Sequence, residues 1–227
     1  MHDKHILEVI ENGLPAWKNL SKEEQAYLLQ NSIEVGYKAH QTIHGDEEDC
    51  LGVLLVETGE LRIYILSEEG REVTLYRLGA GDVCILSASC ILSSISFDVF
   101  IDTESNVTAV LMNTEAFSKI MRKNIYLENY VYQVTTERFS DVMWAMQQVL
   151  FMSMDKRLAI YLLDEVNRTK TLCVEVTHET IAKYIGSARE VVSRMLKYFE
   201  KEGIVELNRG GILIINKEKL KKAIDGR

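Results

Sequence analysis

The sequence has one proline, four cysteines and no run of about 18 apolar residues, the length that a transmembrane helix requires. We therefore expect no membrane-spanning helix. Four cysteines are too few for a disulfide scaffold, and none forms a C-x-x-C pair. The N-terminus, M-H-D-K-H-I-L-E-V-I-E-N, lacks the basic-then-apolar pattern of a signal peptide, so the expected location is the cytoplasm.

The net charge of −8 is unevenly distributed along the chain. Residues 155–227 carry 15 Lys and Arg against 11 Asp and Glu, a net charge of +4. Residues 1–154 carry 11 against 23, a net charge of −12. Such asymmetry indicates two domains, of which the basic C-terminal one is suited to neutralising nucleic-acid phosphates.

A helix-turn-helix is predicted between Thr177 and Lys201. Apolar residues at i, i+1 and i+4 indicate a short first helix: Ile181, Ala182 and Ile185. Gly186 suits a sharp turn because glycine adopts positive φ freely. Ser187 can then cap a second helix by accepting from an exposed backbone N–H. The apolar stripe of that second helix consists of Val191, Val192, Met195, Leu196 and Phe199.

The opposite face of the second helix carries Arg189, Glu190, Ser193, Arg194 and Lys197. The second helix of a helix-turn-helix enters the major groove and presents its N-terminal side chains to base edges. A guanidinium matches guanine O6 and N7, and a carboxylate accepts from cytosine N4, each contact discriminating by about 1–3 kcal/mol. The alternative is the solvated face of an ordinary amphipathic helix.

This segment closely resembles the helix-turn-helix of bacterial CRP/FNR transcription regulators, whose reading helix carries R-E-x-x-x-R or E-x-x-S-R. Residues 189–194, R-E-V-V-S-R, satisfy both patterns. The resemblance implies that Arg189 and Arg194 contact guanines, that Glu190 contacts a cytosine, and that RNA polymerase is a partner. The predicted DNA-binding residues are Arg189, Glu190, Ser193, Arg194, Thr177, Ser187, Lys197 and Arg209.

The N-terminal part predicts two short helices followed by β-structure. The first helix, near residues 4–12, is ended by Gly13 and Pro15. The second opens at the capping box Ser21–Glu24 and continues to about Asn31. From Ile33 to Asn113, short β-type runs alternate with glycine turns, which predicts an antiparallel sandwich or β-roll. Three runs resemble the sensor β-roll of the CRP/FNR family: V-E-T-G-E-L-R-I-Y, E-E-G-R-E-V-T-L and L-G-A-G-D.

Residues 114–152 have a helical pattern. Thr114 is expected to cap a short helix, and a longer helix follows to about Met152. Apolar residues recur in the longer helix at roughly 3.5-residue spacing, which predicts a dimer seam. The alternative is a helix that packs on its own domain, although the resemblance also implies a dimerisation helix here. The seam residues are Tyr132, Phe139, Val142, Met146 and Val149.

The remaining C-terminal residues complete a winged helix-turn-helix. Asp155 is expected to cap the helix that opens this domain. After Gly203, two apolar runs, 204–207 and 212–215, flank Asn208-Arg209-Gly210-Gly211 and predict a β-hairpin wing. Arg209 at its tip is a candidate phosphate contact. Plain solubility is the alternative explanation for this arginine.

The sensor segment departs from the family pattern. Cyclic-nucleotide-binding members carry an arginine after the G-D/E turn, since a bound phosphate needs a cation or several N–H donors. From Leu78 to Ser118 this sequence has no Lys, Arg or His. We therefore predict no binding of cyclic AMP in the usual mode, which leaves an apolar effector or an empty pocket. The first 49 residues contain no cysteine, so an iron–sulfur cluster is not expected.

Two other groups of residues are weaker candidates. Cys84 and Cys90 could form a redox pair, although small buried thiols are the common alternative. His40 and His44 would share one face of an extended strand. A metal or haem site there competes with polar residues at a strand end, and no metal ligand set is predicted.

Together these observations predict an α+β protein with three parts. Residues 1–122 form an antiparallel β-roll (a jelly roll of the cyclic-nucleotide-binding type), residues 123–153 a long dimerisation helix, and residues 154–227 a winged helix-turn-helix. The predicted function is a homodimeric, sequence-specific regulator of transcription that binds palindromic double-stranded DNA. Its effector is unidentified, and no cofactor or catalytic residue is predicted. The alternatives are a constitutive or accessory DNA-binding regulator with a degenerate sensor, and a β-roll metal enzyme.

Overall fold

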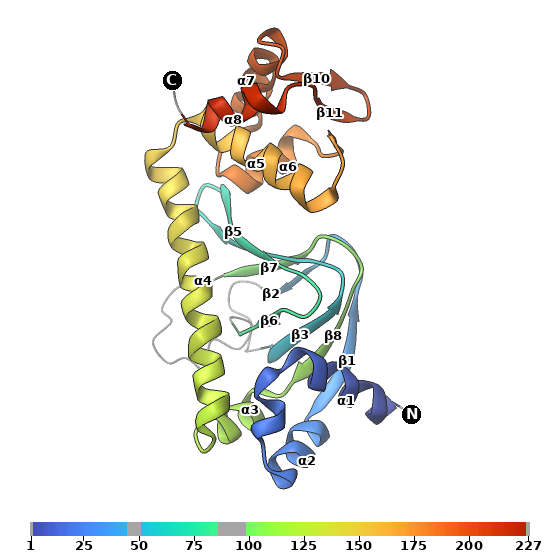
Figure 1. Cartoon of the computed structure of the whole chain (residues 1–227). Helices are drawn as coiled ribbons and strands as arrows, with labels where there is room; N and C mark the ends of the chain where they lie inside the picture. Colours follow the sequence, from blue (N-terminus) through green and yellow to red (C-terminus); the bar gives the residue numbers. More distant parts are fainter. Residues whose placement is uncertain (1, 45–50, 86–98, 226–227) are drawn as a thin grey trace. The chain divides into compact units, whose positions relative to one another are not determined.

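A computed structural model describes residues 2–44, 51–85 and 99–225. The chain divides into two compact units, which are described separately. The first comprises Met1–Ile65 and Leu75–Val142, and the second comprises Leu66–Thr74 and Met143–Arg227. This division falls inside the longest helix (Figure 1).

The first unit begins with three short helical elements: α1 (His2–Gly13), the 3-10 helix η1 (Pro15–Asn19) and α2 (Lys22–Gln30). The predicted capping box is confirmed. Ser21 Oγ accepts from the backbone N–H of Glu24 at 3.2 Å, and a Glu24 carboxylate oxygen accepts from the N–H of Ser21 at 2.8 Å. This N–H donor from Ser21 lowers the pKa of Glu24. The two hydrogen bonds satisfy donors that a helix start leaves free.

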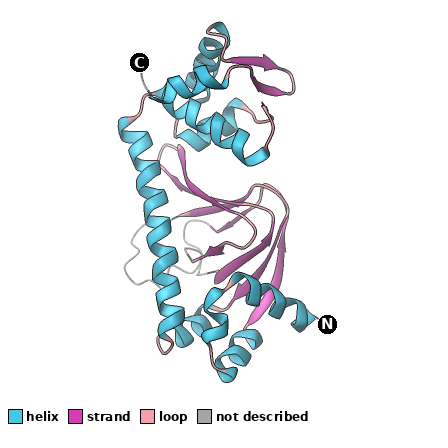
Figure 2. Cartoon of the chain, in the orientation of Figure 1, coloured by secondary structure: helices cyan, strands magenta, loops and turns pink. Residues whose placement is uncertain are grey.

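Antiparallel strands form the predicted β-roll (Figure 2). One four-stranded sheet has the order β1-β8-β3-β6, and the other has the order β2-β7-β4-β5. The strands are β1 (Ser32–Tyr37), β2 (Thr42–His44), β3 (Val53–Thr58), β4 (Leu61–Leu66), β5 (Glu72–Leu78), β6 (Val83–Cys84), β7 (Phe100–Thr103) and β8 (Val107–Met112).

The first four residues of strand β3, Val53–Val56, are buried on both faces, which explains why all four are apolar. Val53 and Leu55 belong to the core that includes the N-terminal helices. Leu54 and Val56 alternate with them and therefore point to the other face of the sheet, where they are equally buried. The β-roll thus has apolar packing on both sides of its central strand.

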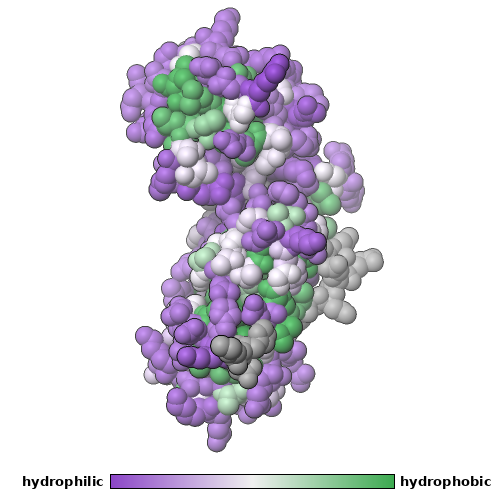
Figure 3. Space-filling view, turned by 90° about the vertical axis from the view of Figure 1, so that its right-hand side faces the viewer, coloured by the Kyte–Doolittle hydropathy of each residue, from purple (hydrophilic) through white to green (hydrophobic). Residues whose placement is uncertain are grey.

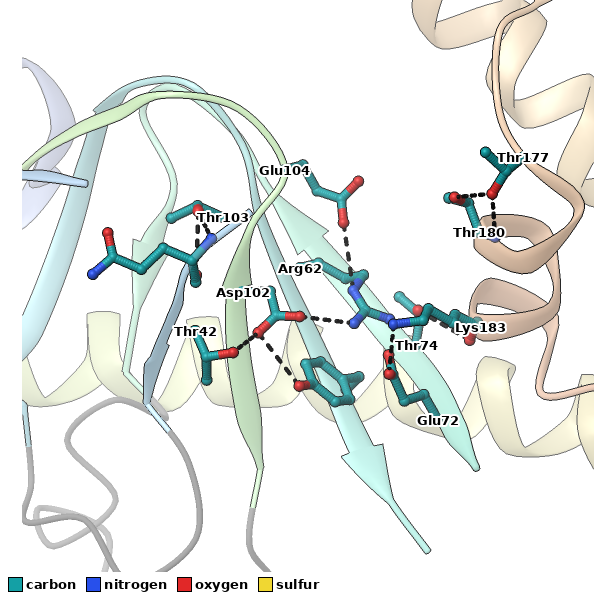
Figure 4. Close-up of polar contacts among 12 residues, drawn as sticks. Thr42, Arg62, Glu72, Thr74, Asp102, Thr103, Glu104, Thr177, Thr180 and Lys183 are labelled. Carbon is teal, nitrogen blue, oxygen red and sulfur yellow. Dashed lines mark hydrogen bonds and ion pairs between the residues drawn. The ribbon is translucent and has the colours of Figure 1, made fainter. Parts of the chain in front are cut away.

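Arg62 on β4 is buried, although it alternates along the strand with the apolar residues Leu61 and Ile63. Its guanidinium pairs with Asp102 on β7 at 3.0 Å and with Glu104 at 3.4 Å (Figure 4). Asp102 also accepts from the hydroxyl of Thr42 at 2.7 Å. Two carboxylates therefore compensate the desolvation of the buried arginine.

Helices α3 (Thr114–Met121) and α4 (Ile125–Phe151) follow the sheets. The expected cap at Thr114 is wrong by one residue. Asn113 is the N-cap, and its side-chain oxygen accepts from the N–H of Ala116 at 3.1 Å. Asn is favoured at this position for the same reason as Thr, because its side chain can accept from a free N–H of the first turn.

The second unit has a three-stranded sheet of order β10-β11-β9 among its helices. The expected cap at Asp155 is wrong, because the N-cap of α5 is Ser153, two residues earlier. Asp155 lies instead in the first turn, where its negative charge interacts favourably with the helix dipole. The elements are α5 (Met154–Thr169), β9 (Cys173–Val174), α6 (His178–Ile185), α7 (Arg189–Lys201), β10 (Val205–Asn208), β11 (Gly211–Ile214) and α8 (Lys217–Asp225).

The face drawn in Figure 3 is mostly hydrophilic and has separate hydrophobic areas. None of the described helices combines the length and apolar character that crossing a membrane requires.

Candidate nucleic-acid interface

Thr177 caps the first helix of the predicted helix-turn-helix. Its hydroxyl accepts from the N–H of Thr180 at 3.0 Å and bonds the Thr180 hydroxyl at 2.8 Å (Figure 4). The predicted apolar residues Ile181, Ala182 and Ile185 are all buried. Thr177 itself is exposed, so the N-terminus of α6 lies at the molecular surface.

The turn between α6 and α7 depends on Gly186, which has φ 61° and ψ 50°. This left-handed conformation costs a residue with a Cβ roughly 1–2 kcal/mol. The expected cap at Ser187 is wrong, since Ala188 is the N-cap of α7 and makes no side-chain cap. The N–H of Ser187 instead donates to the carbonyl of Ala182 at 2.9 Å, so this residue closes α6.

Helix α7 has the predicted two faces. Val192, Leu196 and Phe199 are buried in the core of the unit. Arg189, Glu190, Arg194 and Lys197 are exposed, and Ser193 is half-buried between them. Residues three and four positions apart share one helix face, so these side chains form a single polar surface.

The two arginines of this surface are available to a ligand. In the part of the chain that the structure describes, no ion pair engages Arg189 or Arg194. Ser193, in contrast, has a partner that the sequence did not indicate. Its Oγ lies 2.8 Å from Nδ1 of His178, the first residue of α6. Burial and then the charge of Arg189 lower the pKa of His178.

Basic side chains from other elements donate hydrogen bonds to carbonyls at the C-terminal ends of α6 and α7. Arg157 on α5 donates from Nη1 to the carbonyl of Ile185, just before the turn, at 2.8 Å. Lys219 on α8 donates to the carbonyl of Glu202, just after α7, at 2.7 Å. These carbonyls belong to helix ends, where acceptors lack intrahelical partners. Neither contact can be predicted from a local sequence pattern, because each joins distant parts of the sequence.

The segment Leu66–Thr74 clusters with this unit and contacts α6. Glu72 pairs with Lys183 at 2.8 Å, and the hydroxyl of Thr74 donates to the carbonyl of Lys183 at 3.4 Å (Figure 4). Val73 approaches the turn, since a Cβ on Gly186 would lie 3.0 Å from a Val73 methyl carbon.

The predicted wing is a β-hairpin of β10 and β11, paired from Val205 with Ile214 to Asn208 with Gly211. Arg209 is exposed at its tip. A Cβ on Gly211 would lie 2.6 Å from the carbonyl oxygen of Val174, so a close approach between strands requires glycine here.

The predicted seam residues of α4 are largely outside the core. Tyr132, Phe139, Met146 and Val149 are exposed, whereas Val142 is half-buried. Exposed Met143 and Leu150 were not predicted. Spacing of three and four residues joins one continuous exposed row: Tyr132, Thr136, Phe139, Met143, Met146 and Leu150.

The other candidate sites are the cysteine pair Cys84 and Cys90 and the histidine pair His40 and His44. Cys84 is buried, and Cys90 lies outside the described residues. His40 has φ 61° and precedes β2, so the expected shared strand face with His44 is wrong. In the described ranges, no group of three His, Cys, Asp or Glu side chains could hold a metal ion.

Known proteins resemble both units. Residues 156–223 match the Crp-like helix-turn-helix domain, and residues 34–124 match the cyclic nucleotide-binding domain. A solved structure of a CRP/FNR-family transcriptional regulator from Eubacterium rectale is 43% identical, with a TM-score of 0.91. The similarity covers 95% of this chain and 100% of that one.

Curated proteins match over similar lengths. The transcriptional regulator flp of Lacticaseibacillus casei is 25% identical over 90% of this chain and 93% of its own. The CRP-like cAMP-activated global transcriptional regulator of Mycobacterium tuberculosis is 24% identical over 86% of this chain and 89% of its own.

A β-roll, a long helix and a winged helix-turn-helix with an exposed polar face define a class, the DNA-binding transcription regulators with a domain of the cyclic nucleotide-binding type. Within that class, the chain belongs to the CRP/FNR family. The fold and the family predicted from the sequence are confirmed.

Proposed function

We propose that this protein binds a palindromic promoter site as a homodimer and regulates transcription in response to a signal other than cyclic AMP. The observation that carries the DNA-binding part is the polar face of α7. Arg189, Glu190 and Arg194 are exposed on one side, while Val192 and Leu196 anchor the other side in the core. A rigid helix with exposed guanidinium groups suits the major groove.

The C-terminal unit adds sequence-independent contacts in this proposal. Residues 155–227 have a net charge of +4, which favours binding to phosphates. The proposed phosphate contacts are Arg209 at the wing tip, Lys197 on α7, Thr177 and Ser187. Such contacts orient a protein on the duplex without selecting a sequence.

The exposed row on α4 supports the homodimer. Phe139 is 63% exposed and Leu150 is 64% exposed, which is unfavourable for large apolar side chains in a monomer. Their spacing matches the seam of a two-helix coiled coil. In a dimer, two reading helices about 34 Å apart would contact successive major-groove faces. RNA polymerase is the further partner that membership in the family suggests.

The proposed signal differs from cyclic AMP because the sensor lacks a cation at the expected place. Residues 78–118 contain no Lys, Arg or His, and a cyclic phosphate needs a charge-assisted partner. Calorimetric titration should therefore show no cyclic AMP binding at micromolar concentrations. Micromolar or tighter binding in the β-roll would overturn this part of the proposal.

Selection of binding sites from a random duplex library tests the whole proposal. The purified, reduced protein is used first without a ligand and then with a metabolite extract. Enrichment of a palindrome, with half-sites near TGTGA or TTGAT, supports dimeric readout. Enrichment without the extract favours the alternative, a constitutive regulator with a degenerate sensor. No enrichment under either condition would contradict sequence-specific binding.

A further inference from the structure

His178 and Ser193 connect the two helices of the helix-turn-helix through their side chains. Nδ1 of His178 lies 2.8 Å from Oγ of Ser193, at the distance of a short hydrogen bond. His178 is the first residue of α6, and Ser193 lies one turn after Arg189 on α7. Both side chains are half-buried. The contact therefore lies at the base of the polar face of α7 rather than in the core.

The direction of this hydrogen bond depends on which ring nitrogen of His178 carries a proton. Burial, and then the positive charge of Arg189 on α7, lower the pKa of His178. The ring is consequently neutral at pH 7 and has one nitrogen with a lone pair. In the tautomer with the proton on Nε2, the lone pair lies on Nδ1 and the Ser193 hydroxyl donates to it. The only proton of the Ser193 hydroxyl is then used in this hydrogen bond, and Oγ retains lone pairs that can accept from another donor.

We propose that His178 is a specificity-determining positioning residue, which holds Ser193 as a hydrogen-bond acceptor toward DNA. In the major groove, adenine N6 and cytosine N4 present amino groups, whereas thymine O4 and guanine O6 present acceptors. Ser193 held in this way accepts from an amino group and disfavours a base that offers an acceptor. A free serine hydroxyl would bond either kind of base. This inference rests on the proposed function, because it requires α7 to enter the major groove.

Five proteins test the inference: the full-length wild type, Ser193→Ala, His178→Leu, the double variant of these two, and His178→Asn. Their affinity is measured for a selected palindrome and for duplexes in which each half-site base pair is changed in turn. Ser193→Ala and His178→Leu should lose preference at the same base pair, by roughly two- to ten-fold, as expected for one hydrogen bond. The double variant should lose no more than either single variant. His178→Asn should retain the preference, because an amide oxygen replaces the Nδ1 acceptor.

The outcomes separate this inference from the proposed function. If the wild type shows no sequence preference, both fail. If it does show one, and His178→Leu keeps the wild-type pattern or weakens all duplexes equally, only the role of His178 is refuted. Thermal melting checks that each variant folds. If His178→Leu does not fold, His178→Phe replaces it, since this variant keeps an aromatic ring without the acceptor.

Discussion

Arg157 on α5 donates a hydrogen bond from Nη1 to the carbonyl oxygen of Ile185, the last residue of α6, at 2.8 Å. The Nε of the same guanidinium is buried and has no hydrogen-bond partner in the described structure. Burial also lowers the pKa of Arg157. Arg157 is therefore partly desolvated, and its hydrogen bond binds the carbonyl of Ile185, which lies directly before the turn between α6 and α7.

Replacing Arg157 with Met should destabilise the C-terminal unit by about 1–2 kcal/mol. A hydrogen bond to a charged group contributes about 1.5–3 kcal/mol, and removing the unpartnered Nε recovers part of that loss. Urea unfolding measures the change. Lys201→Met, at an exposed position on α7, is the control and should stay within about 0.5 kcal/mol of wild type. Equal stability of both variants would contradict the role of the bond.

Gly186→Ala should destabilise the same unit by about 1–2 kcal/mol, because alanine disfavours the left-handed conformation. The new Cβ would also lie 3.0 Å from a Val73 methyl carbon. Gly210→Ala is the matched control, since a Cβ there meets nothing within 4 Å. Thermal unfolding of both variants decides the point, and an unchanged melting temperature for Gly186→Ala would refute a strained turn.

His178 should make the free protein less stable in mild acid. Its folded pKa is lowered below the ordinary value of about 6.5, so the unfolded chain binds the proton more readily. The contribution of this residue to stability is therefore complete above about pH 6.5 and is lost as the pH falls through the folded pKa. His178→Asn should show a smaller loss between pH 7.5 and pH 5.5. Identical pH profiles, measured by urea unfolding, would exclude this linkage.

Features with a local pattern are predictable from the sequence alone. The capping box of Ser21 and Glu24, the glycine turn at Gly186 and the two faces of α7 all depend on residues within a few positions of one another. Even there, the register of a cap can err by one residue, because Asn113 and Thr114 both suit the position.

Contacts between distant residues are not predictable in this way. Arg62 has the spacing of an outward strand residue, yet Asp102, 40 positions later, pairs with it and permits its burial. The bond between His178 and Ser193 likewise depends on how two helices cross. The seam of α4 is predictable only in part. Its spacing is a local pattern, but the burial of Val142 depends on what packs against the helix.

Arg194→Ala should remove sequence preference more than total affinity. A guanidinium that contacts a guanine discriminates by about 1–3 kcal/mol, whereas phosphate contacts elsewhere maintain general binding. Fluorescence anisotropy with the selected palindrome and with a scrambled duplex of equal length measures both quantities. Arg209→Ala is the contrasting variant, since loss of a phosphate contact should weaken both duplexes equally. Equal loss on both duplexes for Arg194→Ala would refute direct readout.

Phe139→Glu should convert the proposed dimer into a monomer, because a charge at an exposed seam position opposes burial against a second copy. Sedimentation velocity measures the mass, with Gln147→Glu, an exposed position outside the row, as the control of equal charge. The monomer should bind the palindrome roughly a hundred-fold more weakly, since the second half-site no longer adds avidity. A dimeric Phe139→Glu protein would show that α4 packs only within its own chain and that the seam lies elsewhere.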